Sequence, residues 1–269
     1  MYRGFNLNIN PSQFAGASTI ATGKRVFENH RKLVQESLDS FRDAEGNLLA
    51  ERIMAEWFPN LRPHVFISHS HKDSDQAIGL SGWLSEQFGL TAFVDSCAWG
   101  YAEKLLKAID KEHCWDRETE TYNYQKRNRS TAHVHLMLSN SLMRIVDSTE
   151  CVFFVNTPNS ISTKGFIESS GTTASPWLYT ELMVTQVIRR RSIQAHREDE
   201  HLIKGGATYD AAMESLDIRY PVNTGHLTNL STSDLLEWDK KCPTLPSDPR
   251  TALDVLYAYK EEFQSEPCP

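Results

Sequence analysis

Residues 64–95 constrain the fold more than any other segment, because they indicate a strand, a helix and a second strand in close succession. Residues 64–68 (HVFIS) are a short run of β-branched and aromatic residues, typical of a buried strand. Residues 74–88 carry apolar side chains at helical spacing, and Gly89 is the residue type that commonly ends a helix. Residues 91–95 (TAFVD) predict the second strand. This succession is a βαβ unit, which requires two parallel strands.

A third strand and two further helices extend this pattern. Residues 151–156 (CVFFVN) form a continuous apolar run, as expected for a central strand covered on both faces. Ser175 followed by Pro176 is a typical helix start, and this helix is expected to continue to about residue 191. A fourth strand is predicted at residues 216–222 (LDIRYPV) and a last helix at residues 250–263. The chain is therefore predicted to be an α/β protein with a parallel sheet and helices on both faces.

The length of 269 residues suits one large domain with additions at its ends. Apolar residues recur at helical spacing between residues 23 and 58, so residues 1–60 are predicted to form an N-terminal helical extension. The α/β domain is expected at residues 61–222, with an inserted polar excursion near residues 113–130. Residues 223–269 are expected to be a C-terminal extension packed on that domain.

Charge and apolar patterning argue against several classes of protein. The chain has 28 Lys plus Arg against 35 Asp plus Glu, a net charge of −7, which argues against a broad nucleic-acid surface. No apolar run approaches the length of a membrane span, and the first residues lack the pattern of a signal peptide. The 5 cysteines are widely spaced without a CxxC pair, which favours neither disulfides nor a zinc ribbon. We therefore expect a cytoplasmic protein that binds neither nucleic acid nor membrane.

Arg189, Arg190 and Arg191 form a dense basic run at the end of a predicted helix. Cations at this position complement the negative end of the helix dipole, which is the simpler interpretation. The alternative interpretation is a patch that binds phosphate. The sequence alone favours the first and leaves the second open.

Glu181 is the most unusual residue of the predicted helices. Trp177, Val184 and Ile188 lie four residues before, three after and seven after it, so its carboxylate falls in line with an apolar stripe. Burial there would disfavour the ionised form and raise the pKa of Glu181, which is common at functional sites. The alternative is a glutamate at the edge of the stripe with its carboxylate in water.

Polar and aromatic residues follow the first two predicted strands, where open α/β sheets place their ligand sites. Residues 68–73 (SHSHKD) offer small hydroxyls and amides that suit phosphate or ribose oxygens, although this loop could instead only cap the next helix. Residues 95–101 (DSCAWGY) place two aromatic side chains around a glycine. Those rings could stack on a planar heterocycle, or they could anchor the entry of a helix by packing.

Several common kinds of site lack their sequence signatures. The chain has no G-x-G-x-x-G, P-loop or G-x-S-x-G element, so Rossmann dehydrogenase, P-loop NTPase and esterase interpretations lose their main support. His69 and His71 lie near no cysteine or carboxylate at zinc-like spacing, so no metal site and no metal cofactor are expected. His133 and His135 point to different sides of a helix, and neither is a convincing catalytic base.

Four motifs taken together resemble the Toll/interleukin-1 receptor (TIR) domain, in its bacterial branch. They are VFISHSHKD (65–73), GLTAFVDS (89–96), CVFFVNTPNSI (151–161) and SPWLYTEL (175–182), and the last is the most diagnostic. The resemblance covers residues 63–191, with a weaker extension to residue 222, and it implies a flavodoxin-like parallel sheet. The N-terminal extension, the excursion and the C-terminal segment depart from the family pattern, which leaves the mode of assembly open.

The resemblance also implies an activity. Many TIR proteins cleave NAD at the nicotinamide N-glycosidic bond, and their catalytic glutamate, four residues after the tryptophan, falls on Glu181. The chain is then expected to be an NAD nucleosidase or ADP-ribosyl cyclase that uses NAD as substrate and needs no other cofactor. By the same resemblance, anti-phage defence signalling, other TIR protomers and an effector that senses a cyclic product are the expected context. The residues expected to bind substrate are Ser68, His69, Ser70, Asp95, Trp99, Tyr101 and Trp177.

Two other functions fit the same sequence. One is a TIR module without activity, whose loops bind other TIR domains as an assembly scaffold, since one fold hosts both functions. The other is a nucleoside or deoxyribosyl transferase on a related sheet, which would use a carboxylate in the same way. Glu181 at its place relative to Trp177 tilts the choice toward NAD cleavage.

Overall fold

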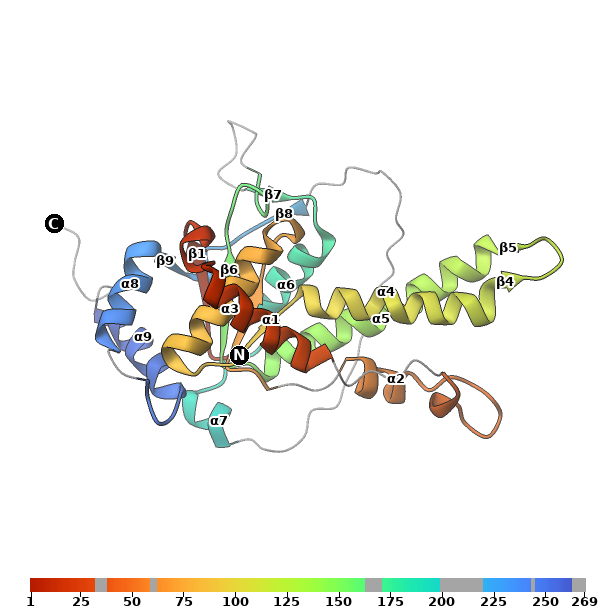
Figure 1. The fold of residues 1–269 in the computed structure, drawn as a ribbon, viewed down its shortest axis with the longest axis horizontal. Helices are drawn as coiled ribbons and strands as arrows, with labels where there is room; N and C mark the ends of the chain where they lie inside the picture. The colour runs from red at the N-terminus through yellow and green to blue at the C-terminus, as the bar shows by residue number, and fades with distance from the viewer. Residues whose placement is uncertain (32–37, 59–61, 163–170, 199–219, 243–244, 263–269) are drawn as a thin grey trace.

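The computed structural model describes residues 1–269 except 32–37, 59–61, 163–170, 199–219, 243–244 and 263–269. The chain is an α/β protein built on a 5-stranded parallel sheet in the order β3-β2-β6-β1-β9 (Figure 1). This order is compatible with a flavodoxin-like fold. The strands are β1 (Arg3–Asn8), β2 (Val65–Ser68), β3 (Ala92–Val94), β6 (Cys151–Val155) and β9 (Thr228–Ser231).

Helices cover both faces of the sheet, as predicted. Phe153 and Phe154 are neighbours in β6, so their side chains point to opposite faces. Phe153 contacts Trp238 on α8, whereas Phe154 packs in a cluster with Leu178 of α6. One face therefore carries α8 (Thr232–Lys241) with α3 (Ser74–Phe88) and α9 (Arg250–Glu262), and the other carries α6 (Pro176–Val187) with α5 (Tyr124–Ser148).

The local signals around the βαβ unit are confirmed. Helix α3 spans Ser74–Phe88, and the Gly89 that ends it has a left-handed backbone with φ of 68°. Such a backbone is open to glycine without the steric cost that a side chain brings. Helix α6 begins after Ser175, whose hydroxyl accepts the backbone N–H of Leu178, and Pro176 occupies its first turn. Beyond it lies the short helix α7 (Ile193–Glu198).

The prediction that residues 1–60 form a helical extension is wrong at its beginning. Helices α1 (Ala17–Arg31) and α2 (Ala50–Trp57) are present, but Arg3–Asn8 forms strand β1 between β6 and β9 inside the sheet. Phe5 and Leu7 are fully buried there, and the side chain of Asn6 donates a hydrogen bond of 2.9 Å to Asn229 on β9. The N-terminal segment is therefore part of the core.

The predicted fourth strand is not a member of the parallel sheet. Residues 216–219 lie outside the described part of the chain, and Tyr220–Pro221 forms β8, which pairs antiparallel with β7 (Thr172–Thr173). The last sheet position is taken instead by β9, from the segment expected to be an extension. Helices α8 and α9 follow β9, and Trp238 of α8 is fully buried against Phe88 and Phe153.

The predicted polar excursion corresponds to an arm that extends away from the sheet (Figure 1). Helix α4 (Ser96–Ile109) leads into it and the 25-residue helix α5 returns from it, packed against α4. The two-residue strands β4 (Trp115–Asp116) and β5 (Thr121–Tyr122) pair near its tip. Of the described helices, none is long and apolar enough to cross a membrane.

Helices α1 and α3 approach so closely that their contact requires glycine. A methyl group on Gly82 would lie 1.8 Å from the carbonyl oxygen of Thr19, and one on Gly23 would lie 2.0 Å from the carbonyl oxygen of Ile78. Both obstacles are backbone atoms, which cannot rotate away as a side chain can. The sequence pattern gives no sign of this contact.

Gly82→Ala is expected to lower the free energy of unfolding by about 3 kcal/mol, the upper end of the range for overpacking, because the two helices must separate. Urea unfolding at equilibrium measures the change. Gly100→Ala is the matched control, since nothing lies within 4 Å of a methyl group at this position of α4. Alanine there should stabilise by about 0.5–1 kcal/mol. Similar unfolding curves for the two variants would contradict the close approach of α1 and α3.

Candidate active site

The candidate site lies at the carboxyl ends of β2 and β3, where α6 passes close to them. Ser68 ends β2, and Asp95 directly follows β3. Glu181 reaches the same place from α6, in the segment between β6 and β9. All 3 side chains are almost fully buried, with exposures of 2% for Ser68, 0% for Asp95 and 3% for Glu181.

Glu181 points into the protein and not into water. The hydroxyl of Ser68 donates a hydrogen bond of 2.5 Å to Glu181 Oε2. Leu178 and Leu182, on the same buried face of α6, pack with Phe154 of the sheet. The sequence-based interpretation of a carboxylate in an apolar stripe is confirmed, and the alternative with its head in water is wrong.

Two causes raise the pKa of Glu181 well above its usual 4.5. The larger cause is burial, which penalises the charged form, and the second is the nearby negative charge of Asp95. The hydrogen bond from Ser68 opposes the shift, because it stabilises the ionised form. Among the described residues, no donor reaches Glu181 Oε1, whereas Asp95 lies within hydrogen-bond reach of the carboxyl group.

His69 holds Asp95 from the opposite side. The backbone N–H of His69 donates to Asp95 Oδ2 at 3.1 Å, and His69 Nδ1 lies against Asp95 Oδ1 as a close ion pair. This contact is an ion pair only when the imidazole of His69 is protonated. The other ring nitrogen of His69, Nε2, is buried without a partner among the described residues.

Trp99 covers this pair. Its ring stacks on His69 with centroids 5.9 Å apart and an angle of 16°, and it lies 6.0 Å from the ring of His71. Its indole Nε1 is buried without a partner in the part of the chain that the structure describes. The polar atoms of His69 and Trp99 that remain unpaired therefore lie close to the two coupled carboxyl groups.

The loops that follow β2 and β6 are tied together beside the site. Asp73 is 4% exposed, and its carboxylate accepts the hydroxyl of Thr157 at 2.5 Å and the amide of Asn159 at 2.7 Å. Thr157 N–H in turn donates to the hydroxyl of Ser160. These bonds fix the loop after β2, from which Ser68 and His69 project, relative to the neighbouring strand.

The structure brings together only part of the predicted substrate-binding set. Ser68, His69, Asp95 and Trp99 gather around Glu181 directly or through one another. Ser70 is buried in the next turn of the same loop, and its carbonyl accepts the N–H of Asp73. The other two pack elsewhere: Tyr101 is buried in the hydrophobic core, and the half-buried Trp177 packs edge-on against His135 of α5 at 5.3 Å.

Sequence reasoning missed the coupling of Asp95 to Glu181 and to His69. Asp95 and His69 follow neighbouring parallel strands, so their closeness could have been inferred from the βαβ unit. The approach of Glu181 depends on how α6 crosses the sheet, for which the sequence holds no local signal. His71 beside Trp99 was also missed as a contact.

The cluster suits proton-coupled work on a polar or cationic ligand and offers little to a metal. Within the described residues, no group of three or more His, Cys, Asp and Glu side chains is placed to hold a metal ion. A carboxyl group with a raised pKa can be neutral while the site is closed and become ionised when a cation arrives. A buried carboxylate would then oppose a developing positive charge strongly, because little water screens it.

Asp95→Asn is expected to lower the pKa of Glu181, because it removes the like charge while burial remains. Titration of the Glu181 carboxyl carbon by ¹³C NMR, assigned with Glu181→Gln, measures the change. The value should move toward 4.5 but stay above it, since burial is the larger cause. Asp75→Asn, an exposed aspartate in the first turn of α3, is the control and should leave the titration unchanged. An unaltered Glu181 titration in Asp95→Asn would refute the coupling.

Comparison of the chain with models of protein families, with curated proteins and with solved structures found no match.

Proposed function

We propose that this chain is a TIR-type enzyme that cleaves NAD at the nicotinamide N-glycosidic bond. The observation that carries the proposal is the buried carboxyl group of Glu181, hydrogen-bonded to Ser68 and coupled to Asp95 at the carboxyl edge of the sheet. Open α/β sheets bind their ligands at this edge. The activity would be that of an NAD nucleosidase or an ADP-ribosyl cyclase.

The strand order supports the finer fold assignment. Counted from β2, the first three strands of the expected domain lie in the order second, first, third, as β3-β2-β6. Flavodoxin-like sheets share this order. In place of their fourth and fifth strands this chain has β1 and β9, which come from its two ends. The proposal is therefore a TIR domain in which both terminal segments complete the sheet.

The chemistry of the bond fits a site with one carboxylate. Nicotinamide leaves from a pyridinium that is already cationic, so its departure needs neither a metal nor a strong acid. The ribose that remains develops positive charge, as in other glycoside cleavages. Ionised Glu181 would oppose that charge and accept hydrogen bonds from the ribose hydroxyls, and each 1.4 kcal/mol of such stabilisation is about tenfold in rate.

Binding of the cationic substrate would also set the protonation state of Glu181. In the closed site the pKa of Glu181 is raised, which favours the neutral acid. A positive charge beside the carboxyl group lowers that pKa again. Because Glu181 is only 3% exposed, NAD reaches it only after the side chains that cover it move. Trp99 stacks on His69 at this place, and we expect its ring to move when substrate binds.

The proposed test follows nicotinamide release from NAD by chromatography, with wild type, Glu181→Ala and Glu181→Gln at equal folded concentration. Release by wild type and its loss in both variants is the expected result. Equal activity in all three proteins would reject the assignment. Release should rise more steeply than enzyme concentration if other protomers complete the site, which is the assembly that the resemblance implies.

The same assay separates the rival functions. No turnover by wild type, even at concentrations at which it assembles, would favour a scaffold that binds other TIR protomers. Turnover of free nucleosides in preference to NAD would favour a nucleoside or deoxyribosyl transferase. Analysis of the product identifies the second half of the reaction, since water gives ADP-ribose and an adenine nitrogen gives a cyclic isomer. A cyclic product would fit defence signalling to an effector.

A further inference from the structure

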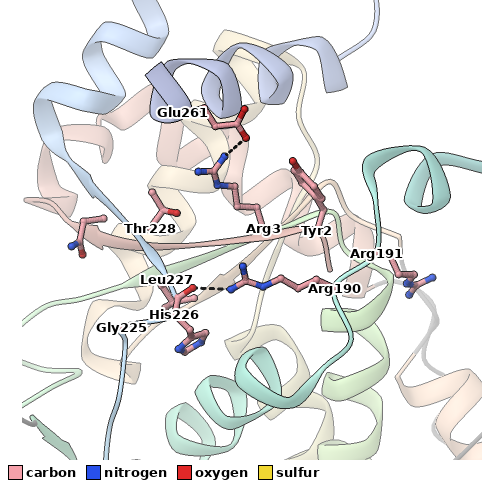
Figure 2. Close-up of a pocket in the computed structure, with 10 residues that line it drawn as sticks. Tyr2, Arg3, Arg190, Arg191, Gly225, His226, Leu227, Thr228 and Glu261 are labelled. Atoms are coloured by element: carbon pink, nitrogen blue, oxygen red, sulfur yellow. Dashed lines mark hydrogen bonds and ion pairs between the residues drawn. The ribbon is translucent and has the colours of Figure 1, made fainter. Parts of the chain in front are cut away.

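A second polar site lies at the amino ends of the parallel strands, whereas Glu181 lies at their carboxyl ends. A pocket of about 550 Å³ opens between the start of β1, the start of β9 and the segment after α6 (Figure 2). Arg3 begins β1 and Thr228 begins β9, so the pocket lies at the amino ends of these parallel strands. Its volume falls in the range of small-molecule sites. Nothing in the proposed NAD chemistry uses it.

Arginine dominates the charge of the pocket, although the chain as a whole has a net charge of −7. Arg3, Arg190 and Arg191 line it, and Glu261 is the acidic residue among the described lining residues. Arg191 is already engaged, because its guanidinium donates to Asp147 and its side chain points away from Arg190 and His226 in Figure 2. Arg3 is paired as well, with Glu261, so the charge available to a ligand is that of Arg190.

Arg190 holds a charge that no carboxylate in the described part of the chain neutralises. Its Nη2 donates to the backbone carbonyl of His226 at 2.8 Å, and a carbonyl leaves the positive charge in place. Burial lowers the pKa of the His226 ring, and the charge of Arg190 lowers it further. A guanidinium that is held in position by one neutral acceptor keeps other N–H groups for a ligand.

Arg3 lines the pocket at the start of β1, but its guanidinium points toward α9 and away from that of Arg190 in Figure 2. Its Nη1 donates to Glu261 at 3.1 Å, and this pair is visible in Figure 2. Arg3 also lies over the rings of Phe5 and Tyr257, so its side chain is held on the α9 side. Thr228 adds a hydroxyl to the lining, and Tyr2 adds an aromatic ring.

We propose that this pocket binds a small molecule carrying a phosphate monoester, with Arg190 contacting the phosphate. Guanidinium groups match phosphate oxygens in shape as well as charge, because their N–H donors form a planar fork. A pocket of this size holds more than the phosphate alone, and Tyr2 gives the remainder of the ligand an aromatic surface. Helix α6 ends at Val187 and not near residue 191 as predicted, so the basic run at 189–191 lies beyond its last turn and the helix-dipole interpretation does not apply. The phosphate interpretation is the one proposed, through Arg190.

Arg190 has a structural role that the test must separate from binding. Thr185 and Gln186 of α6 also bond to the turn at residues 223–226, so Arg190 is one of several clamps on that turn. Arg190→Gln keeps a donor for the carbonyl of His226 and removes the charge. Arg190→Lys keeps the charge and loses the planar fork. Arg189→Gln removes the same charge from the exposed neighbour, which does not line the pocket.

Isothermal titration of the full chain with inorganic phosphate, AMP and adenosine, at constant ionic strength, tests the proposal. Wild type should bind AMP and phosphate but not adenosine. Arg190→Gln should weaken AMP binding by about tenfold or more, as expected for loss of one charged hydrogen-bond donor. Arg190→Lys should bind with intermediate affinity, and Arg189→Gln should bind as wild type does.

Three outcomes would overturn the phosphate site. They are no binding of AMP or phosphate by wild type, adenosine binding equal to that of AMP, and equal losses in Arg190→Gln and Arg189→Gln. Circular dichroism of each variant shows whether a loss of AMP binding reflects misfolding. If Arg190→Gln is misfolded, the affinity of Arg190→Lys for AMP decides whether the charged group at this position binds phosphate. Glu181→Gln should bind AMP at this site unchanged, so the two sites can fail independently of one another.

Discussion

Glu181→Gln is expected to lose nicotinamide release by about 10²–10³-fold and at the same time to become more stable than wild type at neutral pH. The first effect is the usual cost of removing one group that stabilises charge in a transition state. The second follows from the raised pKa of Glu181, whose ionisation the folded protein resists. A change that disables the chain while strengthening its fold is typical of a residue kept for function.

The sign of the stability effect follows from proton linkage. In the unfolded chain Glu181 ionises near its usual value of 4.5, whereas in the folded chain its pKa is well above that. The folded state then binds more protons, so wild type loses stability as pH rises from 4.5 to the folded pKa, by about 1.4 kcal/mol per unit. Glutamine carries no charge, and its amide can still accept from Ser68 and donate to Asp95.

Thermal unfolding of both proteins between pH 4 and pH 8 measures the difference. Glu181→Gln and wild type should have similar melting temperatures near pH 4, and the variant should melt increasingly higher as pH rises. Glu103→Gln is the matched control, because the same substitution at this exposed position of α4 should change neither stability nor turnover. Melting temperatures that stay equal at every pH would show that Glu181 ionises without cost.

The sequence was sufficient where a local rule decides the structure. Helix α3 begins and ends as predicted, because its apolar spacing and the left-handed Gly89 both mark it. Glu181 was found because helical periodicity places it among apolar neighbours, whatever the rest of the fold does. These features depend on a few consecutive residues, so no long-range contact was needed to predict them.

The sequence was insufficient where pairing with a distant strand determines whether a segment joins the sheet. Strand β1 contains asparagines at positions 6 and 8, which have low strand propensity, and it is stable because Asn6 and Asn8 bond to Asn229 on β9. Strand β9 also contains an asparagine, Asn229, so its own sequence is no clearer a sign of a strand. The predicted strand near residue 220 has better local propensity, but Tyr220 and Pro221 pair outside the sheet. The pairing of β1 with β9 therefore outweighs the local strand propensity of these segments.

The candidate site shows the same division. Ser68 and Asp95 were expected at the ends of neighbouring strands, and they lie there. Tyr101 belongs to the core, because α4 begins at Ser96 and turns this side chain inward. Trp177 packs on His135, because α5 lies beside α6. Which face a helix presents to a distant neighbour is a tertiary property, which spacing along the chain does not determine.

Arg197→Met is expected to lower the free energy of unfolding by about 3 kcal/mol at pH 7, through the loss of a partner for a buried charge. Arg197 of α7 donates two hydrogen bonds to Glu150, of 3.0 and 2.9 Å, and two to Asp254 on α9, of 3.3 and 2.9 Å. Glu150 is 5% exposed, whereas the Arg197 side chain keeps 24% exposure, which places the effect at the low end of values for buried pairs.

The pH dependence of this variant has a definite sign. Without Arg197, the buried carboxylate of Glu150 has lost its cationic partner, and burial penalises its charged form. Protonation removes this unpaired charge, so the gap in stability between wild type and variant should narrow as the solution is acidified. In wild type, hydrogen bonds to Glu150, and then to Asp254, raise the pKa of Arg197, so the cation persists at every accessible pH.

A second substitution separates the charge from the packing. Glu150→Gln in the Arg197→Met background removes the stranded carboxylate, and its amide can still accept the hydroxyl of Tyr257. Urea unfolding of the double variant should recover most of the stability that Arg197→Met loses, because the cost lies in an unpaired buried charge. Lys240→Met, which breaks an exposed pair with Glu237, should cost about 0–1 kcal/mol. If the effects of Arg197→Met and Glu150→Gln simply add, the ion pair does not hold α7 and α9 to the sheet.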